Sequence, residues 1–258
     1  MKKIISSIMT LTIAITMASC GGNAKNGVRE AQELSGAGAT FPLPFYNVVF
    51  ENFAQVNGDI VAYGGVGSGG GVRNLRDKVV DFAGSDAFLT DKEMAEMAPV
   101  VHVPTCMGAV VVAYNLDGVK ELKLTGEVVA DIFAGKIKMW NDERLTALNP
   151  NVTLPAETII PVFRSDGSGT TFIFTDYLTK VSPMWKEKFG AGKSVNFPSG
   201  QAAKGNLLHS LFTFRGRVFQ WDKGCIGAEY RNRLVGGYSV NYIWTVGLLH
   251  FTANPYGT

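Results

Sequence analysis

The sequence has few of the side chains that build metal centres and catalytic triads. Its 258 residues include three cysteines and three histidines, with no Cys-x-x-Cys pair and no cluster of the two residue types. This count excludes a disulfide-stapled scaffold and argues against a metal site. His209 and His250 lie in an unusual C-terminal part, and His102 lies in an apolar run that predicts a core residue rather than a base. A Ser-His-Asp triad is therefore poorly supplied.

Motifs of nucleotide-handling and acyl-transfer enzymes are also missing. No complete Gly-x4-Gly-Lys-Ser/Thr stretch is present, which excludes a P-loop, and neither Ser68 nor Ser168 has glycine at both flanking positions of a nucleophile elbow. A GxGxxG pattern runs from Gly65 to Gly70, with Asp86 downstream, but it is a weak signal in a chain with 30 glycines. These absences favour a binding protein over an enzyme, with no cofactor and no metal.

Charged residues are sparse and nearly balanced, at 18% of the chain and a net charge of +2. This balance gives no case for nucleic acid or an anionic membrane surface as a partner. The average conceals a split, because residues 20–206 carry 17 basic and 20 acidic side chains. Residues 207–258 carry five basic, two acidic and ten aromatic side chains. A site for an anion in the mildly acidic body must therefore be built locally.

The N-terminus has the pattern of a signal peptide. Two lysines precede an apolar run from Ile4 to Met17, which is too short to span a bilayer as a helix. The run ends in Ala18-Ser19-Cys20, which resembles a bacterial lipoprotein cleavage box. We therefore expect residues 1–19 to be a lipoprotein signal peptide, Cys20 to be lipidated, and residues 20–34 to be a tether. An ordinary signal peptide with a chance cysteine is the alternative.

Short apolar runs alternate with helical patterns along the body of the chain. Strands are predicted at Asp59–Tyr63, Val100–Val103, Ala109–Tyr114 and Thr158–Phe163. An amphipathic helix is predicted over Pro42–Gln55, with Phe45, Val49 and Phe53 one turn apart, and Thr90 with Glu93 predicts a capping box. This alternation favours α/β layers around a largely parallel sheet. Proline and glycine between residues 99 and 108 indicate a lobe boundary.

Three segments place glycines and a hydroxyl group at a predicted helix start. They are Gly36–Pro42, Gly64–Gly71 and Ser165–Thr171. A helix start offers unpaired N–H groups and partial positive charge, glycine allows close approach, and Ser or Thr adds an O–H donor. One such turn is usually only a cap. Three of them, with Arg164 directly before the third, predict a desolvated oxyanion surrounded by donors.

Several longer stretches resemble one known family. Gly36-AGATFP-Leu43, Tyr63-GGVGSGGGV, Val80-DFAGSDA, Asp131-IFAGKIKMWND, Leu148-NPNVTLP and Phe163-RSDGSGTTFIFTDYL are similar to the periplasmic phosphate-binding proteins of bacterial phosphate-specific ABC transporters. The resemblance runs in family order from Ser35 to Asn206. It implies an α/β type II periplasmic-binding-protein fold, with two α/β lobes at 35–104 and 105–206. A ligand cleft at the hinge would close over one phosphate ion.

The resemblance also implies a set of phosphate-binding residues. In the first lobe these would be Thr40, the backbone N–H of Phe41, Ser68 and Asp86. The second lobe would add Arg164, Ser168, Gly169 and Thr170, with Asp166 supporting Arg164. Asp86 would accept the proton that phosphate carries, whereas sulfate carries none and would leave two acceptors facing each other. The implied function is delivery of inorganic phosphate in the periplasm to the permease of an ABC importer in the inner membrane. A binding protein for another tetrahedral oxyanion is the alternative.

The resemblance stops after residue 206. Residues 207–258 are an atypical tail, rich in aromatics and poor in acids. A shifted reading frame near codon 206 would explain the change in composition, and translation of the other frames tests that hypothesis. The strand that returns to the first lobe would then be lost. The second alternative is therefore a defective relative with an aberrant C-terminus that binds nothing.

Overall fold

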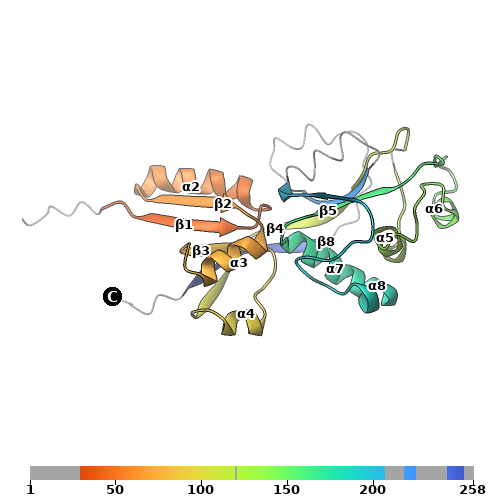
Figure 1. Ribbon diagram of the computed structural model, residues 1–258. Coiled ribbons are helices and arrows are strands. Elements are labelled where there is room, and N and C mark those ends of the chain that lie inside the picture. Colours follow the sequence, from red (N-terminus) through yellow and green to blue (C-terminus); the bar gives the residue numbers. More distant parts are fainter. Residues whose placement is uncertain (1–29, 120, 207–217, 225–242, 253–258) are drawn as a thin grey trace, which may run out of the picture. The chain divides into compact units, whose positions relative to one another are not determined.

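A computed structural model of the chain describes residues 30–206 except residue 120, and the backbone of two strands at 218–224 and 243–252 (Figure 1). The predicted signal peptide, Cys20 and most of the tail lie outside the described residues. In chain order the elements are β1 (Glu33–Gly38), α2 (Leu43–Asn57), β2 (Ile60–Gly65), α3 (Ser68–Arg76), β3 (Phe82–Ser85), α4 (Asp91–Ala95), β4 (Val100–Tyr114), α5 (Gly126–Phe133), α6 (Glu143–Leu148), β5 (Ile160–Arg164), α7 (Gly169–Val181), α8 (Pro183–Lys188), β6 (Gln201–Ala203), β7 (Val218–Gly224) and β8 (Ile243–Thr252).

The strands form one mixed sheet in the order β2-β1-β3-β8-β4-β7-β5-β6. β1 pairs in parallel with β2 and β3, and β5 pairs in parallel with β6 and β7. β8 is antiparallel to β3 and β4, and β7 is antiparallel to β4. The expected α/β architecture is therefore present. We call β1 to β3 with α2 to α4 the N-terminal group, and β5 and β6 with α5 to α8 the C-terminal group.

The N-terminal group is wound in two directions from β1. The chain passes from β1 to β2 on one side of it and then crosses back to β3 on the other. Because crossovers between parallel strands are right-handed, the two connecting helices must lie on opposite faces. Figure 1 shows α2 on one face of these strands and α3 on the other. The carboxyl ends of neighbouring parallel strands then meet at a point where the winding changes direction, which is a usual place for a ligand in such sheets.

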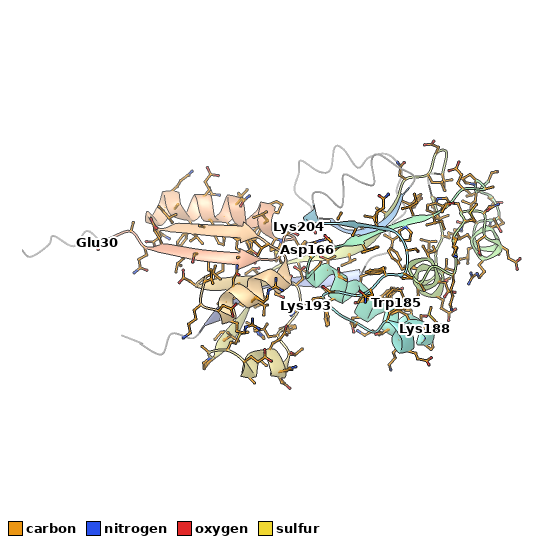
Figure 2. The ribbon with its side chains drawn as sticks, viewed as in Figure 1. Glu30, Asp166, Trp185, Lys188, Lys193 and Lys204 are labelled. Atoms are coloured by element: carbon orange, nitrogen blue, oxygen red, sulfur yellow. The ribbon has the colours of Figure 1, made fainter. Side chains whose placement is uncertain are left out.

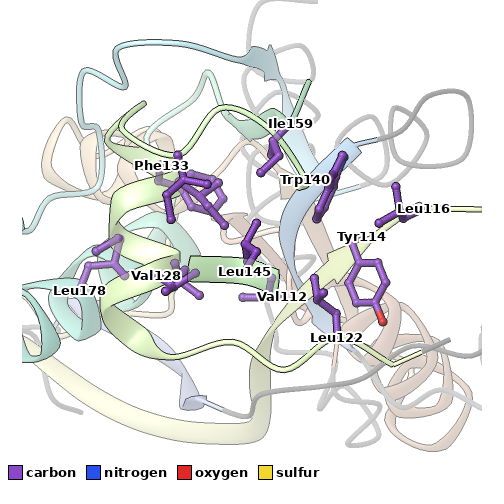
Figure 3. Packing of buried hydrophobic residues seen from close by; sticks show 14 of the residues in the cluster. Val112, Tyr114, Leu116, Leu122, Val128, Phe133, Trp140, Leu145, Ile159 and Leu178 are labelled. Carbon is purple, nitrogen blue, oxygen red and sulfur yellow. The ribbon is translucent and has the colours of Figure 1, made fainter. Parts of the chain in front are cut away.

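Each group surrounds its own apolar cluster. The larger cluster belongs to the C-terminal group and the adjoining end of β4, and Figure 3 shows Phe133, Trp140 and Val112 in it. Phe133, Trp140, Phe174 and Trp185 are 0% exposed. Phe133 and Phe174 meet edge to face with their ring centroids 4.9 Å apart, an arrangement that the charge distribution of aromatic rings favours. In the N-terminal group, Tyr46 and Phe82 are buried against aromatic and aliphatic neighbours from α2 and β2.

The helix predicted over Pro42–Gln55 forms, but the face that it buries is not the predicted one. Phe45, Val49 and Phe53 are 46%, 38% and 40% exposed, whereas Tyr46 is 1% exposed. The reason lies in the composition of α2, which has apolar residues around most of its circumference. A helix of this kind has no single apolar stripe, so its spacing alone does not select the buried face.

The strands predicted at Val100–Val103 and Ala109–Tyr114 are one strand, β4. Its register against β8 shifts between Pro104 and Cys106, at the position where the lobe boundary is predicted. The hydroxyl groups of Tyr46 in α2 and Thr105 in this irregularity are 2.7 Å apart and form a hydrogen bond. Burial raises the pKa of Tyr46 far above its ordinary value, so the phenol keeps its proton at neutral pH.

We expect Tyr46→Phe to lower the free energy of unfolding by about 1 kcal/mol, because it removes one partner of a mostly buried hydrogen bond. Thr105→Val should have a similar effect. The double variant should cost less than the sum of the two single changes, since both remove the same bond. Urea unfolding followed by circular dichroism measures all three. Strict additivity would show that the bond does not contribute.

The tail supplies two strands to the sheet. β7 lies between β4 and β5, and β8 lies between β3 and β4. The sequence suggested that the strand returning to the N-terminal group would be lost. That expectation is wrong for the backbone, because β8 pairs with β3 over Ser85–Phe82 and with β4 over Val100–Val110.

Candidate functional site

The predicted site residues follow the carboxyl ends of parallel strands. Thr40 and Phe41 come just after β1, Ser68 begins α3 after β2, and Asp86 directly follows β3. In the C-terminal group Arg164 ends β5, and Ser168, Gly169 and Thr170 form the start of α7. β1 and β3 run parallel to β4, whereas β5 runs antiparallel to it. The carboxyl ends of the two groups therefore point toward each other along the middle of β4, and we call this junction the site edge. The topology thus gathers residues that are up to 130 positions apart in the chain.

Asp86 lies where the two groups meet. Its side chain is buried, and Thr170 Oγ1 donates to Asp86 Oδ2 over 3.3 Å. Its backbone N–H donates to Ser68 Oγ over 3.4 Å. A Cβ atom placed on Gly169 would lie 2.6 Å from both Ser68 Oγ and the Asp86 Cβ, so only glycine allows this approach. Four of the predicted residues therefore form one contiguous cluster.

Arg164 is held by a carboxylate and an amide. Its Nε donates to Asp166 Oδ1 over 2.7 Å, its Nη2 donates to Asp166 Oδ2, and its Nη1 donates to Asn206 Oδ1 over 2.6 Å. The Arg164 side chain is 2% exposed. A guanidinium has five N–H donors, so three are engaged here by the described residues. Two remain for a ligand. Asp166, the residue expected to support Arg164, binds its guanidinium directly.

Asp166 (Figure 2) is ionised by its partners despite its burial. Burial alone would raise the pKa of this carboxyl group, but the hydrogen bonds and the charge of Arg164 outweigh it. The Gly205 N–H adds a further bond to Asp166 Oδ1 over 3.1 Å. The pKa of Asp166 therefore lies below its ordinary value. A charged Asp166 fixes the plane of the guanidinium, which decides where its remaining N–H groups point.

Thr40 offers a hydroxyl group at the same edge. Its Oγ1 is buried and has no hydrogen-bond partner among the described residues, so it can donate to or accept from a ligand without breaking a protein hydrogen bond. The loop is fixed by the neighbouring Ala39, whose C=O accepts from the Tyr63 hydroxyl over 2.9 Å. Its N–H donates to the Gly84 C=O over 2.8 Å. Phe41 is 3% exposed and directly precedes Pro42, the N-cap of α2.

The helix starts at this edge differ in how they are capped. Ser168 is the N-cap of α7, and its Oγ accepts from the Thr171 N–H over 3.2 Å. Its hydroxyl hydrogen is therefore left to donate. The N-caps of α2 and α3, within the described part of the chain, make no side-chain hydrogen bond to their helices. First-turn N–H groups and a hydroxyl hydrogen are thus available to a ligand at this edge.

The charges at this edge do not by themselves attract an anion. One guanidinium, Arg164, stands against two carboxylates, Asp86 and Asp166. Neutral donors must therefore provide most of the stabilisation of any anion bound here. Among the described residues no group of three or more His, Cys, Asp or Glu side chains is placed to hold a metal ion.

Two residues close to the site were not singled out from the sequence. Asn206 follows the three-residue strand β6 and accepts from Arg164. Lys193, in the loop after α8, accepts the Ser168 N–H on its carbonyl oxygen over 2.8 Å. Lys193 follows Gly190-Ala191-Gly192 and Asn206 follows Gly205, but neither segment directly precedes a predicted helix. A basic residue in a loop usually indicates only a solvated surface, so the sequence carried no signal for Lys193.

The sequence matches the PBP superfamily domain over residues 23–229, which is most of the chain. The chain belongs to this superfamily. The match extends past residue 206, where we expected the resemblance to stop. This family consists of substrate-binding proteins, and substrate-binding proteins are not a class of enzyme.

Individual relatives agree with this assignment. The chain is 45% identical over 179 residues to the phosphate-binding protein PstS of Haemophilus influenzae, covering 69% of this chain and 53% of that protein. It is 37% identical over 219 residues to PstS of Xylella fastidiosa, covering 78% and 60%. The chain thus spans between half and two thirds of the length of these curated relatives.

A solved structure shows the fold. A putative phosphate ABC transporter substrate-binding protein from Clostridium perfringens, with bound phosphate, matches with a TM-score of 0.65 at 17% identity, covering 85% of this chain and 86% of that one. A high-affinity periplasmic phosphate-binding protein bound with phosphate matches with a TM-score of 0.61 at 18% identity, covering 86% and 80%. The PBP chain described here has the α/β type II periplasmic-binding-protein fold.

Proposed function

We propose that this PBP chain binds inorganic phosphate at the edge formed by Thr40, Phe41, Ser68, Asp86, Arg164, Ser168, Gly169 and Thr170. Donors from three helix starts, four hydroxyl side chains, one guanidinium and the Gly169 backbone suit a tetrahedral anion. The relatives named phosphate-binding protein support this choice of anion.

The observation that carries the proposal is the buried carboxylate of Asp86 among hydroxyl donors. A carboxylate repels a fully deprotonated anion. It accepts a hydrogen bond from phosphate, which carries at least one proton at neutral pH. Sulfate has no proton to donate, so its oxygen and the carboxylate would face each other as two unpaired acceptors. The site therefore selects a protonated oxyanion, and the alternative of a sulfate-type binding protein is disfavoured.

The ligand makes contacts with both groups, so it stabilises the arrangement in which they are close together. Phosphate is bound and released unchanged, and the protein acts as a carrier rather than an enzyme. We infer that it works in the periplasm and hands phosphate to the permease of an ABC importer. The N-terminal sequence supports a signal peptide and a lipid anchor at Cys20. Within the described residues no helix is both long and apolar enough to cross a bilayer.

Isothermal titration calorimetry of the purified protein tests the proposal. We expect phosphate to bind with a Kd below about 1 μM and sulfate to bind at least about 10³-fold more weakly. Equal affinity for both ions would contradict the role given to Asp86. No heat for either ion, from a sample with native circular dichroism, would contradict phosphate binding and favour a defective relative.

A further inference from the structure

An ion pair joins the N-terminal and C-terminal groups beside the proposed phosphate site. Lys193 Nζ lies 2.5 Å from Glu93 Oε1, and the two side chains are 18% and 30% exposed. Glu93 belongs to α4, and Lys193 (Figure 2) lies in the loop after α8. The two residues are 100 positions apart in the chain, so the pair forms only when the groups are brought together.

The carboxylate of Glu93 is oriented before it meets the lysine. The predicted capping box is present, with the Thr90 N–H donating to Glu93 Oε2 over 2.9 Å and the Glu93 N–H donating to Thr90 Oγ1 over 3.2 Å. One carboxylate oxygen thus serves the helix and the other faces Lys193. Because the cap already fixes the side chain, pairing loses less side-chain entropy than an ordinary surface ion pair does.

The loop that carries Lys193 is hydrogen-bonded to α7, the helix whose first residues are Gly169 and Thr170. The Lys193 C=O accepts from the N–H of Ser168, the N-cap of α7, over 2.8 Å. The preceding Gly192 N–H donates to Thr175 Oγ1, in the body of the same helix, over 3.1 Å. A force on the Lys193 side chain is therefore transmitted to the start of α7, where the proposed ligand donors lie.

The surroundings of the pair also belong to both groups. A cavity of about 280 Å³ adjoins it, lined by residues from α3, α4 and the loops at 167 and 193–194. Beside it, the Gly69 N–H of α3 donates to the Gly167 C=O over 2.8 Å. Moving α7 away from α3 and α4 would break the ion pair together with this hydrogen bond.

We propose that the Lys193–Glu93 pair is a latch that holds the start of α7 against the N-terminal group and slows the release of bound phosphate. This inference rests on the proposed phosphate site. The pair contributes only to the arrangement in which the groups are close, so it shifts the equilibrium toward that arrangement by its own interaction energy. The latch acts on ligand release because release requires the groups to separate.

The rate of phosphate release tests the latch. It is measured by adding excess unlabelled phosphate to protein loaded with radiolabelled phosphate and separating bound from free label by rapid filtration. Lys193→Met keeps the aliphatic stem, and Glu93→Gln keeps the capping box, so both variants should fold. Each should release phosphate about fivefold faster, while the association rate changes little. The double variant should be no faster than either single one. Lys180→Met is the matched control, because Lys180 pairs over 2.6 Å with Asp176 of the same helix. Unchanged release in both single variants overturns the latch and leaves phosphate binding intact.

A second measurement does not depend on phosphate affinity. A carbodiimide joins a carboxylate and an amine at ion-pair distance as an amide, and takes up the water that is lost. Peptide mass spectrometry should find a Glu93–Lys193 cross-link whose yield rises with phosphate, and an Asp176–Lys180 cross-link whose yield does not. Absence of the first cross-link when the second is present overturns the latch, as does a yield that ignores phosphate. Failure of the proposed function would appear separately, as no binding in calorimetry.

Discussion

Replacing Arg164 by methionine is expected to weaken phosphate binding by about a thousandfold. The side chain is almost fully buried and bound in a two-pronged arrangement to Asp166. Methionine keeps much of its volume but removes the positive charge among the predicted ligands. It also leaves the buried Asp166 carboxylate without its partner, next to an anion that it repels. Calorimetry with phosphate measures the loss.

Two further variants separate the binding role of Arg164 from its structural role. The double variant Arg164→Met/Asp166→Asn has no unpaired carboxylate at position 166. Its free energy of unfolding should therefore return toward that of the unchanged protein, while its phosphate affinity stays low. Arg144→Lys is the matched surface control, because Arg144 also pairs with an aspartate two residues away, Asp142, but is 45% exposed. It should bind phosphate normally. Affinity within tenfold of the unchanged protein for Arg164→Met would show that the guanidinium does not contact the ligand.

Much of this site could be predicted from the sequence because its parts are local. Ser68, Asp86 and Ser168 each lie in a short run of glycines and small polar residues directly after a strand. Strand and helix patterns indicate parallel strands, and within each group parallel strands bring their carboxyl ends together. The two groups then meet because β5 runs antiparallel to β4 whereas β3 runs parallel to it. The structure adds the contacts among them, such as the approach of Gly169 to Ser68.

The parts that could not be predicted depend on tertiary packing. The buried face of α2 is decided by β2 and by Phe82 of β3, which pack against Tyr46, because the helix is apolar nearly all round. β4 continues through the region of Pro104 because β8 pairs along both parts of it. Asn206 and Lys193 gain their roles from contacts with Arg164 and Ser168, which lie 42 and 25 positions away. No local pattern encodes such distances.

The tail is a second case in which the sequence did not predict the structure. Its composition differs from that of the body, and this difference suggested a missing strand. Sheet pairing, however, is made by backbone groups, and many apolar sequences satisfy it. β8 fills the position between β3 and β4 whatever the origin of its sequence. Composition therefore predicts a change of sequence character better than it predicts the loss of a strand.

Asp86→Asn should remove the discrimination between phosphate and sulfate. In the unchanged protein the carboxylate is buried and accepts from the Thr170 hydroxyl, and an ionised carboxylate can only accept hydrogen bonds. Asparagine has nearly the same shape but carries no charge and presents an NH₂ donor as well as a C=O acceptor. The repulsion that excludes sulfate is then gone, and the amide can donate to a sulfate oxygen.

We expect the ratio of the phosphate and sulfate affinities to fall by about 10³-fold or more in Asp86→Asn, chiefly because sulfate binds more tightly. Phosphate affinity should change far less, since the amide oxygen still accepts the phosphate proton. Asp81→Asn is the matched control from the same Val80–Ala87 segment, because Asp81 is exposed and accepts hydrogen bonds from Ser35 instead. Competition calorimetry with both anions measures the ratio. If sulfate binding stays as weak in Asp86→Asn as in the unchanged protein, selectivity arises from the donor geometry and not from this carboxylate.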